Sequence, residues 1–326
     1  MKKIRWGIVG PGCIANKFAT AIKNVECAHL SAVASRTEKN GREFAEKYDI
    51  ENVFVGYEKM AESDLVDAVY IATPHPFHAS CAELFLNAGK HVLCEKPLCV
   101  NARQAEGLKK CAEKNGVFLM EAMWTRFLPA IMEAKKMVER GDIGKVLGIE
   151  ADFCYAIEPE EDPKVFVNGM AGGSRLDVGV YGLHFAAVFL GSSPENITAL
   201  ANVDAGVDIH TNVLLKYENG AIANITSAIG VRKPEKAYIY GSKGQIYIPQ
   251  FYGANELFFS RNEDTEHIVK KSMGEGFEEE IIEVCECIGK GKLQSDVLPL
   301  DESIAILRQM DAVRAQIGVK YPIEKE

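Results

Sequence analysis

The residues best suited to chemistry begin with a glycine-rich loop near the start of the chain. Gly10-Pro11-Gly12-Cys13-Ile14-Ala15 has the pattern GxGxxA and directly follows a β-rich run, Ile4–Val9. Gly10 permits a tight turn, Gly12 lets the backbone approach an anion, and Ala15 allows close packing of helix on strand. The amino end of the following helix offers N–H groups to a phosphate. The loop predicts a dinucleotide site; an ordinary tight turn is the alternative.

The end of the second predicted strand bears on which dinucleotide is bound. A site for NAD usually has Asp or Glu there, which accepts a hydrogen bond from a ribose hydroxyl. This chain has Ser35-Arg36-Thr37 instead. The Arg36 guanidinium can pair with a 2′-phosphate and the two hydroxyls can bond it, so the segment favours NADP, with NAD possible. Stacking of Arg36 on adenine, or a solvated charge at a helix start, is the alternative.

Further reactive side chains follow the fourth and fifth predicted strands. Ala72-Thr73-Pro74, with His78, ends the fourth, and Cys94-Glu95-Lys96-Pro97 ends the fifth. Parallel sheets bind ligands at these carboxyl ends. Desolvation disfavours a lysine's charge, so a lysine placed there is a candidate for chemistry, with a surface lysine as the alternative. We expect cofactor contacts from Thr73, Pro74, His78 (at the nicotinamide ribose), Glu95, Lys96 and Pro97.

A third group of candidate residues lies in the middle of the chain. Asp177 and Tyr181 are four residues apart, and His184 follows three residues later. On a helix that begins by Asp177, the three side chains share one face. Tyrosine titrates near pKa 10 and histidine near 6.5, so either can move a proton if its surroundings adjust its pKa. A core tyrosine and a structurally hydrogen-bonded histidine are the alternatives.

Other residues are expected to complete the site. The glycines at 172 and 173 are expected to let the chain approach the cofactor closely. Four aromatic residues are expected to form a wall around the substrate: Trp124, Phe127, Phe153 and Tyr155. Packing in the core is the alternative, and it is the favoured one for Phe127. We expect substrate contacts from Phe153, Tyr155, Tyr181 and His184, and cofactor contacts from Trp124 and Arg126.

Two scaffolds are needed to position these residues. Strand and helix signals alternate over residues 1–121, and six strands with helices between them predict a doubly wound parallel sheet, an α/β Rossmann domain. Extended segments then predominate, with helices at 178–190, 277–288 and 301–317. This pattern predicts an α+β domain with a large, mostly antiparallel open sheet. We expect an NAD(P)-binding domain over 1–122 and a substrate-binding domain over 123–326.

Composition excludes several classes of protein. The 326 residues are 47% hydrophobic and 25% charged, which is typical of globular chains. Residues 1–123 carry a net charge of +1 and residues 124–326 a net charge of −10, which argues against nucleic acid and anionic membranes as partners. No apolar run reaches 18 residues, so no membrane span is expected. Nine cysteines without a CxxC pair suggest free thiols in a cytoplasmic protein. The sequence contains no motif that resembles HExxH, so no metal site is expected.

In their order along the chain, these motifs resemble those of the Gfo/Idh/MocA oxidoreductase family. The matching segments are residues 10–15, 72–74, 95–97, 172–179 and 299–321. The resemblance implies a Rossmann domain followed by a sheet domain, and a homodimer or higher homo-oligomer formed through the open face of that sheet. It also implies that Lys96 takes part in catalysis beside the nicotinamide and that Asp177 lies on the substrate side.

Within the family, residues 120–127 and Asp177-x-Gly179-x-Tyr181 look most like the branch of dimeric dihydrodiol dehydrogenase and NADP-dependent xylose dehydrogenase. Many members have histidine where this chain has Tyr181, and His184 departs from the Gln or Asn expected in that branch. The resemblance implies an NADP-preferring oxidoreductase that transfers a hydride to or from a hydroxyl carbon of a sugar or vicinal diol, with Lys96 and Tyr181 moving the proton and Asp177 orienting.

Three other functions remain open. One is an NAD-dependent inositol or sugar dehydrogenase in which His184 has a larger catalytic role. Another is a glycoside hydrolase of the same fold that uses tightly bound NAD. The third is a non-catalytic NADP sensor, which would have no need of both Lys96 and Tyr181.

Overall fold

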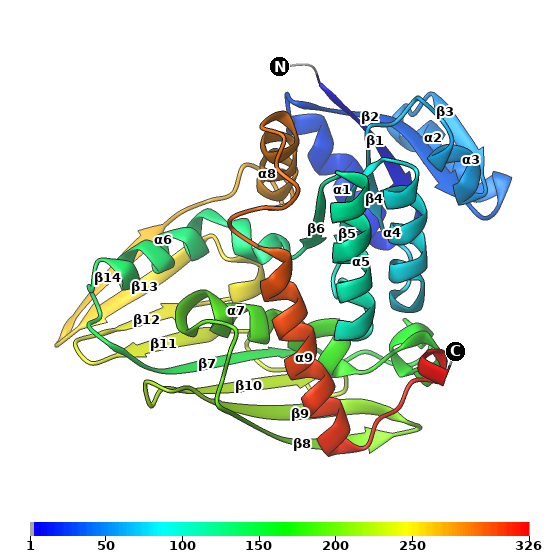
Figure 1. Ribbon diagram of the computed structural model, residues 1–326. Helices are drawn as coiled ribbons and strands as arrows, with labels where there is room; N and C mark the ends of the chain where they lie inside the picture. Colours follow the sequence, from blue (N-terminus) through cyan, green and yellow to red (C-terminus); the bar gives the residue numbers. More distant parts are fainter. Residues whose placement is uncertain (1–2, 326) are drawn as a thin grey trace. The chain divides into compact units, whose positions relative to one another are not determined.

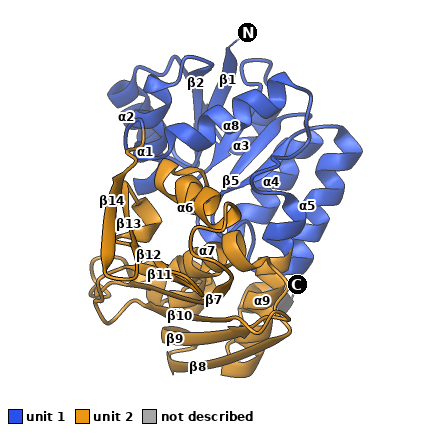
Figure 2. Ribbon diagram, turned by 90° about the vertical axis from the view of Figure 1, so that its left-hand side faces the viewer, with its two compact units in different colours: residues 1–124, 273–304 blue, residues 125–272, 305–326 orange. Residues whose placement is uncertain are grey.

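The protein forms two compact units in a computed structural model that describes residues 3–325 (Figure 2). One unit contains residues 1–124 and 273–304, and the other contains residues 125–272 and 305–326. The sequence suggested a single boundary, between residues 122 and 123. In the structure, residues 273–304 belong instead with the first unit, so the chain leaves that unit and returns to it.

The first unit is built on a six-stranded sheet in the order β3-β2-β1-β4-β5-β6, with every pair parallel. Its inner strands β4 and β5 are almost continuously buried, as expected where helices cover both faces. This confirms the predicted doubly wound sheet. The strands are β1 (Ile4–Val9), β2 (Ala28–Ser35), β3 (Asn52–Val55), β4 (Ala68–Ile71), β5 (His91–Glu95) and β6 (Leu119–Ala122).

Local signals in the sequence set the starts of several helices in this unit. Thr37 caps α2 by accepting a hydrogen bond from the Asn40 N–H, and Asn101 caps α5 by accepting one from Gln104. The short helix α3 was not expected. The helices are α1 (Cys13–Ala21), α2 (Glu38–Tyr48), α3 (Tyr57–Ala61), α4 (His78–Asn87), α5 (Ala102–Asn115) and, after the chain returns, α8 (Glu278–Gly289) (Figure 2).

The second unit contains an eight-stranded sheet in the order β14-β13-β12-β11-β7-β10-β9-β8. Only the β7–β10 pair is parallel, so the predicted mostly antiparallel sheet is confirmed. Strand β14 was not predicted, because it is exposed and mostly polar and so lacks the alternating apolar residues that indicate a strand. The strands are β7 (Val146–Cys154), β8 (Asn196–Asp204), β9 (Val207–Lys216), β10 (Ile222–Ala228), β11 (Ala237–Gly241), β12 (Gln245–Ile248), β13 (Glu256–Arg261) and β14 (Asp264–Val269).

Helix α7 (Val180–Leu190) packs on this sheet against β7 and β10 (Figure 1). The approach is close, because a Cβ atom added at Gly182 would lie 2.3 Å from Cγ2 of Ile225. Helix α6 (Pro129–Glu139) precedes β7, and α9 (Leu300–Ile317) runs from the first unit into the second. Over residues 3–325, no helix is both long enough and apolar enough to cross a bilayer.

Candidate functional site

The glycine-rich loop has the geometry that a pyrophosphate site requires. Gly10 has a φ of +85°, and a Cβ atom there would lie 3.3 Å from the Ala72 carbonyl oxygen, so glycine is needed for both conformation and space. At Gly12, by contrast, no atom lies within 4 Å of an added Cβ. Helix α1 starts there without a capping side chain or an acidic residue in its first turn. Its amino end is therefore suited to an anion.

The end of β2 presents an exposed cation, Arg36. The Ser35 side chain is buried, and its hydroxyl accepts a hydrogen bond from the Thr37 N–H. The Thr37 hydroxyl accepts one from Asn40 at the start of α2. Arg36 between them is exposed, and its guanidinium forms no hydrogen bond or ion pair with the residues that the structure describes. Of the three residues, Arg36 is thus the one whose charge remains available to a ligand.

His78 links the segments that follow β4 and β5. Its ring is buried, with Nε2 2.7 Å from the Thr73 carbonyl oxygen and Nδ1 2.8 Å from that of Pro97. Burial lowers the pKa of His78, whereas the two carbonyl contacts act in the opposite direction. Since both ring nitrogens face backbone, the ring holds the Glu95-Lys96-Pro97 turn against β4. Contact between His78 and a ribose stays a prediction.

Glu95 is the other fixed point of this turn. Its buried carboxylate accepts hydrogen bonds from the Tyr70 hydroxyl and from the Lys96 N–H. Burial raises the pKa of Glu95, and the charge of Lys96 opposes that shift. The Lys96 side chain is half-buried. Tyr70 was not among the predicted site residues, although a tyrosine inside a buried strand needs a partner for its hydroxyl.

In the second unit, Asp177 and Tyr181 face the same end of β7. The Tyr155 hydroxyl donates a hydrogen bond to Asp177, and the Tyr181 ring lies 5.2 Å from the Phe153 ring. Phe153 and Tyr155 are two residues apart on an extended segment, so their side chains lie on the same side of it. Burial and the Asp177 carboxylate both raise the pKa of Tyr155, which keeps it a neutral donor.

The helix that was expected over 178–190 starts differently. Residues 175–179 form a π-helical turn with i→i+5 bonds, and the regular α7 begins only at Val180. The expected i,i+4 spacing on one helix face therefore does not explain the position of Asp177. Asp177 is held by its hydrogen bond with Tyr155, and Tyr181 lies against Phe153 of β7. Turns of this kind are frequent at functional sites.

Asp208 anchors this turn. Its buried carboxylate accepts hydrogen bonds from Ser174 Oγ (2.9 Å), the Arg175 N–H (2.7 Å) and Thr211 Oγ1 (2.9 Å). Gly173 has a φ of +110°, and a Cβ atom there would lie 2.4 Å from Asp208 Oδ1. The close approach that this glycine permits in the structure is to Asp208, whereas the sequence suggested an approach to the cofactor. No local sequence signal identified Asp208.

The aromatic cluster around Phe153 contains a residue that was not predicted. Tyr252 stacks on Phe153 with ring centroids 4.2 Å apart, and its ring lies 6.2 Å from that of Tyr181. It belongs to the short 3₁₀ turn Phe251–Gly253 between β12 and β13. Tyr252 could have been predicted from the sequence, because two adjacent aromatic residues, Phe251 and Tyr252, stand between two predicted strands.

The remaining predicted residues are buried within their own units. Arg126 donates a hydrogen bond to the His184 carbonyl oxygen (3.4 Å), and both residues belong to the second unit. Trp124 stacks on Phe277 in the first unit, with centroids 5.2 Å apart. Phe127 is buried, as the core-packing alternative expects. The cofactor and substrate contacts of these side chains stay predictions.

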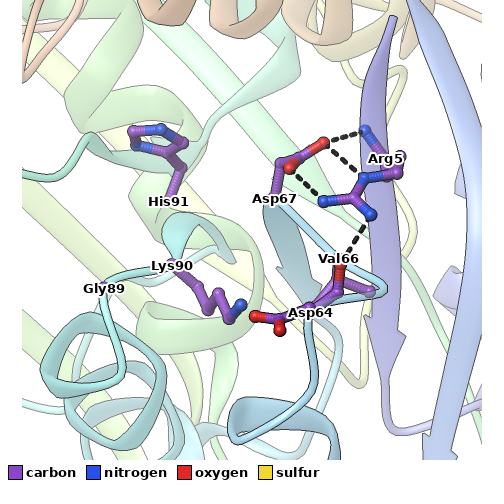
Figure 3. A pocket seen from close by; sticks show the side chains of 7 residues that line it. All are labelled: Arg5, Asp64, Val66, Asp67, Gly89, Lys90 and His91. Atoms are coloured by element: carbon purple, nitrogen blue, oxygen red, sulfur yellow. Dashed lines mark hydrogen bonds and ion pairs between the residues drawn. The ribbon is translucent and has the colours of Figure 1, made fainter.

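A cavity of about 510 Å³ lies elsewhere in the first unit (Figure 3). Arg5 and Asp67, which both line it, form an ion pair (2.6 Å), and the Lys90 ammonium donates a hydrogen bond to the Ser63 carbonyl oxygen (2.7 Å). Arg5 and Asp67 therefore neutralise each other, and no predicted site residue lines the cavity. Within the described part of the chain, no three His, Cys, Asp or Glu side chains are grouped to hold a metal ion.

Comparisons with known proteins cover almost the whole chain. Residues 4–123 match the family profile described as "Oxidoreductase family, NAD-binding Rossmann fold", and residues 131–247 match the "GFO/IDH/MocA C-terminal domain". The chain is 36% identical over 332 residues to trans-1,2-dihydrobenzene-1,2-diol dehydrogenase of Mus musculus, with 99% of each covered.

Two solved structures are also similar. One is a 3-ketoreductase from Actinomadura kijaniata in complex with NADP and TDP-benzene (28% identity, TM-score 0.88, covering 97% of this chain and 98% of the other). The other is an aldose-aldose oxidoreductase from Caulobacter crescentus complexed with glycerol (25% identity, TM-score 0.89, 97% of each chain).

Proposed function

Because the chain belongs to the Gfo/Idh/MocA oxidoreductase family and is an NAD(P)-dependent oxidoreductase, we propose that it prefers NADP and acts on a hydroxyl carbon of a vicinal diol or sugar. The observation that carries this proposal is the placement of Asp177, Tyr155 and Tyr181 at one end of β7, beside the aromatic group of Phe153 and Tyr252. A carboxylate and two phenols can bind a hydroxylated substrate and move its proton. The names of the similar proteins support diols or sugars as the substrate class.

The residues present fit the dinucleotide. Gly10, Gly12 and the uncapped start of α1 would hold its pyrophosphate, and Arg36 its 2′-phosphate. When bound, the nicotinamide supplies the redox chemistry by taking up or releasing a hydride. Nine free cysteines favour a reducing compartment such as the cytoplasm.

The protein's own side chains would handle the proton. Asp177, already an acceptor for Tyr155, would orient the reacting hydroxyl. Tyr181 would accept its proton as a phenolate, and Lys96 would assist as the second acid–base group. His184 would have a smaller part than Tyr181, whose ring adjoins the aromatic group of Phe153 and Tyr252.

The function is tested by measuring turnover of diols, aldoses and inositols with NADP⁺ and NAD⁺. We expect oxidation of a vicinal diol or sugar, with a higher kcat/KM for NADP⁺. The variant Arg36→Asp should weaken NADP⁺ binding by about tenfold or more, because a charge-assisted pair is lost, and should favour NAD⁺ in relative terms. Arg42→Asp is the control, because Arg42 already pairs with Glu38 on the same unit. A wild type that prefers NAD⁺ would refute the role of Arg36.

We further propose that the chain forms a homodimer through the open face of the eight-stranded sheet. Asn212, Leu214 and Lys216 are alternate residues of β9 and so point to the same face of the sheet. Leu200 of β8 is paired with Asn212, and Ile222 of β10 is paired with Lys216. The three apolar side chains therefore lie on one side of the sheet. They are 77%, 47% and 51% exposed, which is typical of a surface that binds a partner.

Light scattering on the purified protein tests this proposal. We expect about twice the chain mass of 35.8 kDa for the wild type and a shift toward the chain mass for Leu214→Lys, because a charge at the centre of the interface would be buried without a partner. Leu65→Lys, at an exposed leucine of the first unit, should remain dimeric. A monomeric wild type, or a Leu214→Lys dimer of unchanged stability, would contradict the proposed interface.

A further inference from the structure

The turn that carries Asp177 is held by a buried tyrosine that none of the proposed steps uses. Tyr321 follows α9 and is 1% exposed. Its hydroxyl donates a hydrogen bond to the Gly172 carbonyl oxygen (3.1 Å) and accepts one from Nη2 of Arg175 (2.9 Å). Arg175 is the first residue of the π-helical turn. One hydroxyl thus connects a side chain of the turn with the backbone that leads into it.

The Arg175 guanidinium depends on this hydroxyl. Arg175 is 1% exposed, and among the described residues its guanidinium bonds only to Tyr321 and to the Met310 carbonyl oxygen of α9 (3.3 Å). A buried cation is strongly disfavoured unless hydrogen bonds satisfy it. Burial raises the pKa of Tyr321, and the charge of Arg175 opposes that shift. The protonated hydroxyl can therefore donate to Gly172 while it accepts from Arg175.

Strand β9 holds the same residue through its backbone. Oδ2 of the buried Asp208 carboxylate accepts hydrogen bonds from the Arg175 N–H (2.7 Å) and from Ser174 Oγ (2.9 Å). Arg175 is therefore fixed twice, by its N–H to the sheet and by its guanidinium to Tyr321 and α9. All these residues belong to the second unit.

Asp177 is tied closely to the residues held in this way. It lies two positions after Arg175, and its N–H donates a hydrogen bond to the Gly173 carbonyl oxygen (3.2 Å). Its carboxylate accepts the hydrogen bond of the Tyr155 hydroxyl. A shift of residues 172–175 would therefore move the Asp177 carboxylate relative to Tyr155.

We propose that Tyr321 and Asp208 are positioning residues for Asp177: together they fix the first residues of the π-helical turn, so that the Asp177 carboxylate has one orientation toward Tyr155 and the reacting hydroxyl. Both act through the turn and not on the substrate itself. An orienting group misplaced by about 1 Å can slow a reaction by about 10²-fold. This inference rests on the orienting role proposed for Asp177.

The first test follows the hydrogen bond between Tyr155 and Asp177 by nuclear magnetic resonance and does not depend on activity. In protein that is isotope-labelled at Cζ of every tyrosine, the Tyr155 resonance is assigned from its loss in Tyr155→Phe. Tyr321→Phe keeps the ring and deletes one hydroxyl, and it should shift or broaden that resonance. Tyr217→Phe should leave it in place, because the buried Tyr217 hydroxyl has no partner among the described residues. An unchanged Tyr155 resonance in Tyr321→Phe would overturn the role of Tyr321.

The second test separates positioning from stability. Below the unfolding temperature, Tyr321→Phe should lower kcat by about tenfold and keep NADP⁺ affinity within about twofold. The affinity should persist because the glycine-rich loop and Arg36 belong to the first unit. A residue with a purely structural role would lower the unfolding temperature and leave the kcat of the folded molecules unchanged. Wild-type kcat in folded Tyr321→Phe protein would therefore also overturn the role of Tyr321.

The role of Asp208 is tested with two hydroxyls that donate to the same carboxylate oxygen. Ser174→Ala removes the donor beside the turn, and Thr211→Val removes the donor on β9. Both hydrogen bonds are 2.9 Å long, so the two variants should lose similar stability. Only Ser174→Ala should shift the Tyr155 resonance and lower kcat, by about three- to tenfold. Equal effects of the two variants on kcat, or no effect of Ser174→Ala, would overturn the role of Asp208.

Two further variants keep the outcome unambiguous. If Tyr321→Phe does not fold, Arg175→Lys replaces it: lysine keeps the charge but lacks the planar fork that reaches both Tyr321 and the Met310 carbonyl. An unshifted Tyr155 resonance in Arg175→Lys would overturn the role of Tyr321. If Asp177→Asn retains turnover, the proposed orienting role of Asp177 fails, while the Tyr155 resonance in Tyr321→Phe still reports whether Tyr321 holds the turn.

Discussion

Turnover is expected to fall by about 10²–10⁴-fold when Lys96 is replaced by methionine, with dinucleotide affinity within a few-fold of the wild type. The reason is the position of Lys96. It follows directly on the buried, doubly hydrogen-bonded Glu95, and the next residue, Pro97, is held by His78. The turn is therefore fixed by other groups, and methionine keeps most of the volume of the side chain while removing its charge and protons.

Steady-state kinetics and fluorescence titration with NADP⁺ measure the two quantities separately. Lys110→Met is the matched control, because Lys110 is an exposed lysine on α5 of the same unit. It removes the same charge and should leave turnover unchanged. Near-wild-type turnover in a folded Lys96→Met protein would exclude Lys96 from the mechanism.

The second large effect is expected at Tyr181. Tyr181→Phe keeps the ring that packs against Phe153 and Tyr252 and deletes only the hydroxyl, so turnover should fall by about 10²-fold or more with little change in NADP⁺ binding. His184→Asn should have a smaller effect, mainly on KM, as expected for a group that binds ground state and transition state alike.

Kinetics of both variants on one accepted substrate decide between these residues. Tyr217→Phe is the control for loss of a buried hydroxyl, because Tyr217 is buried in the same unit and its hydroxyl has no partner among the described residues. The opposite order of effects is physically possible, since an unperturbed histidine titrates near pKa 6.5. A fast Tyr181→Phe enzyme together with a nearly inactive His184→Asn enzyme would assign the proton transfer to His184.

The sequence by itself determined the fold class of both units and the nucleotide loop. The alternation of strands and helices is a local pattern, and so is GxGxxA between the first strand and the first helix. The carboxyl ends of neighbouring parallel strands must meet at one edge of a sheet, so the Thr73 and Lys96 segments could be assigned to that edge before any contact was known.

Only the tertiary structure decided which groups support these segments. The hydrogen bonds of Tyr70 with Glu95, and of Asp208 with Ser174, join residues that lie 25 and 34 positions apart. Trp124 stacks on Phe277 only because residues 273–304 return to the first unit. Such contacts leave no periodic pattern, since each depends on one side chain meeting one distant partner. Burial then raises the pKa of Glu95, and burial is a property of the folded chain and not of any segment of it.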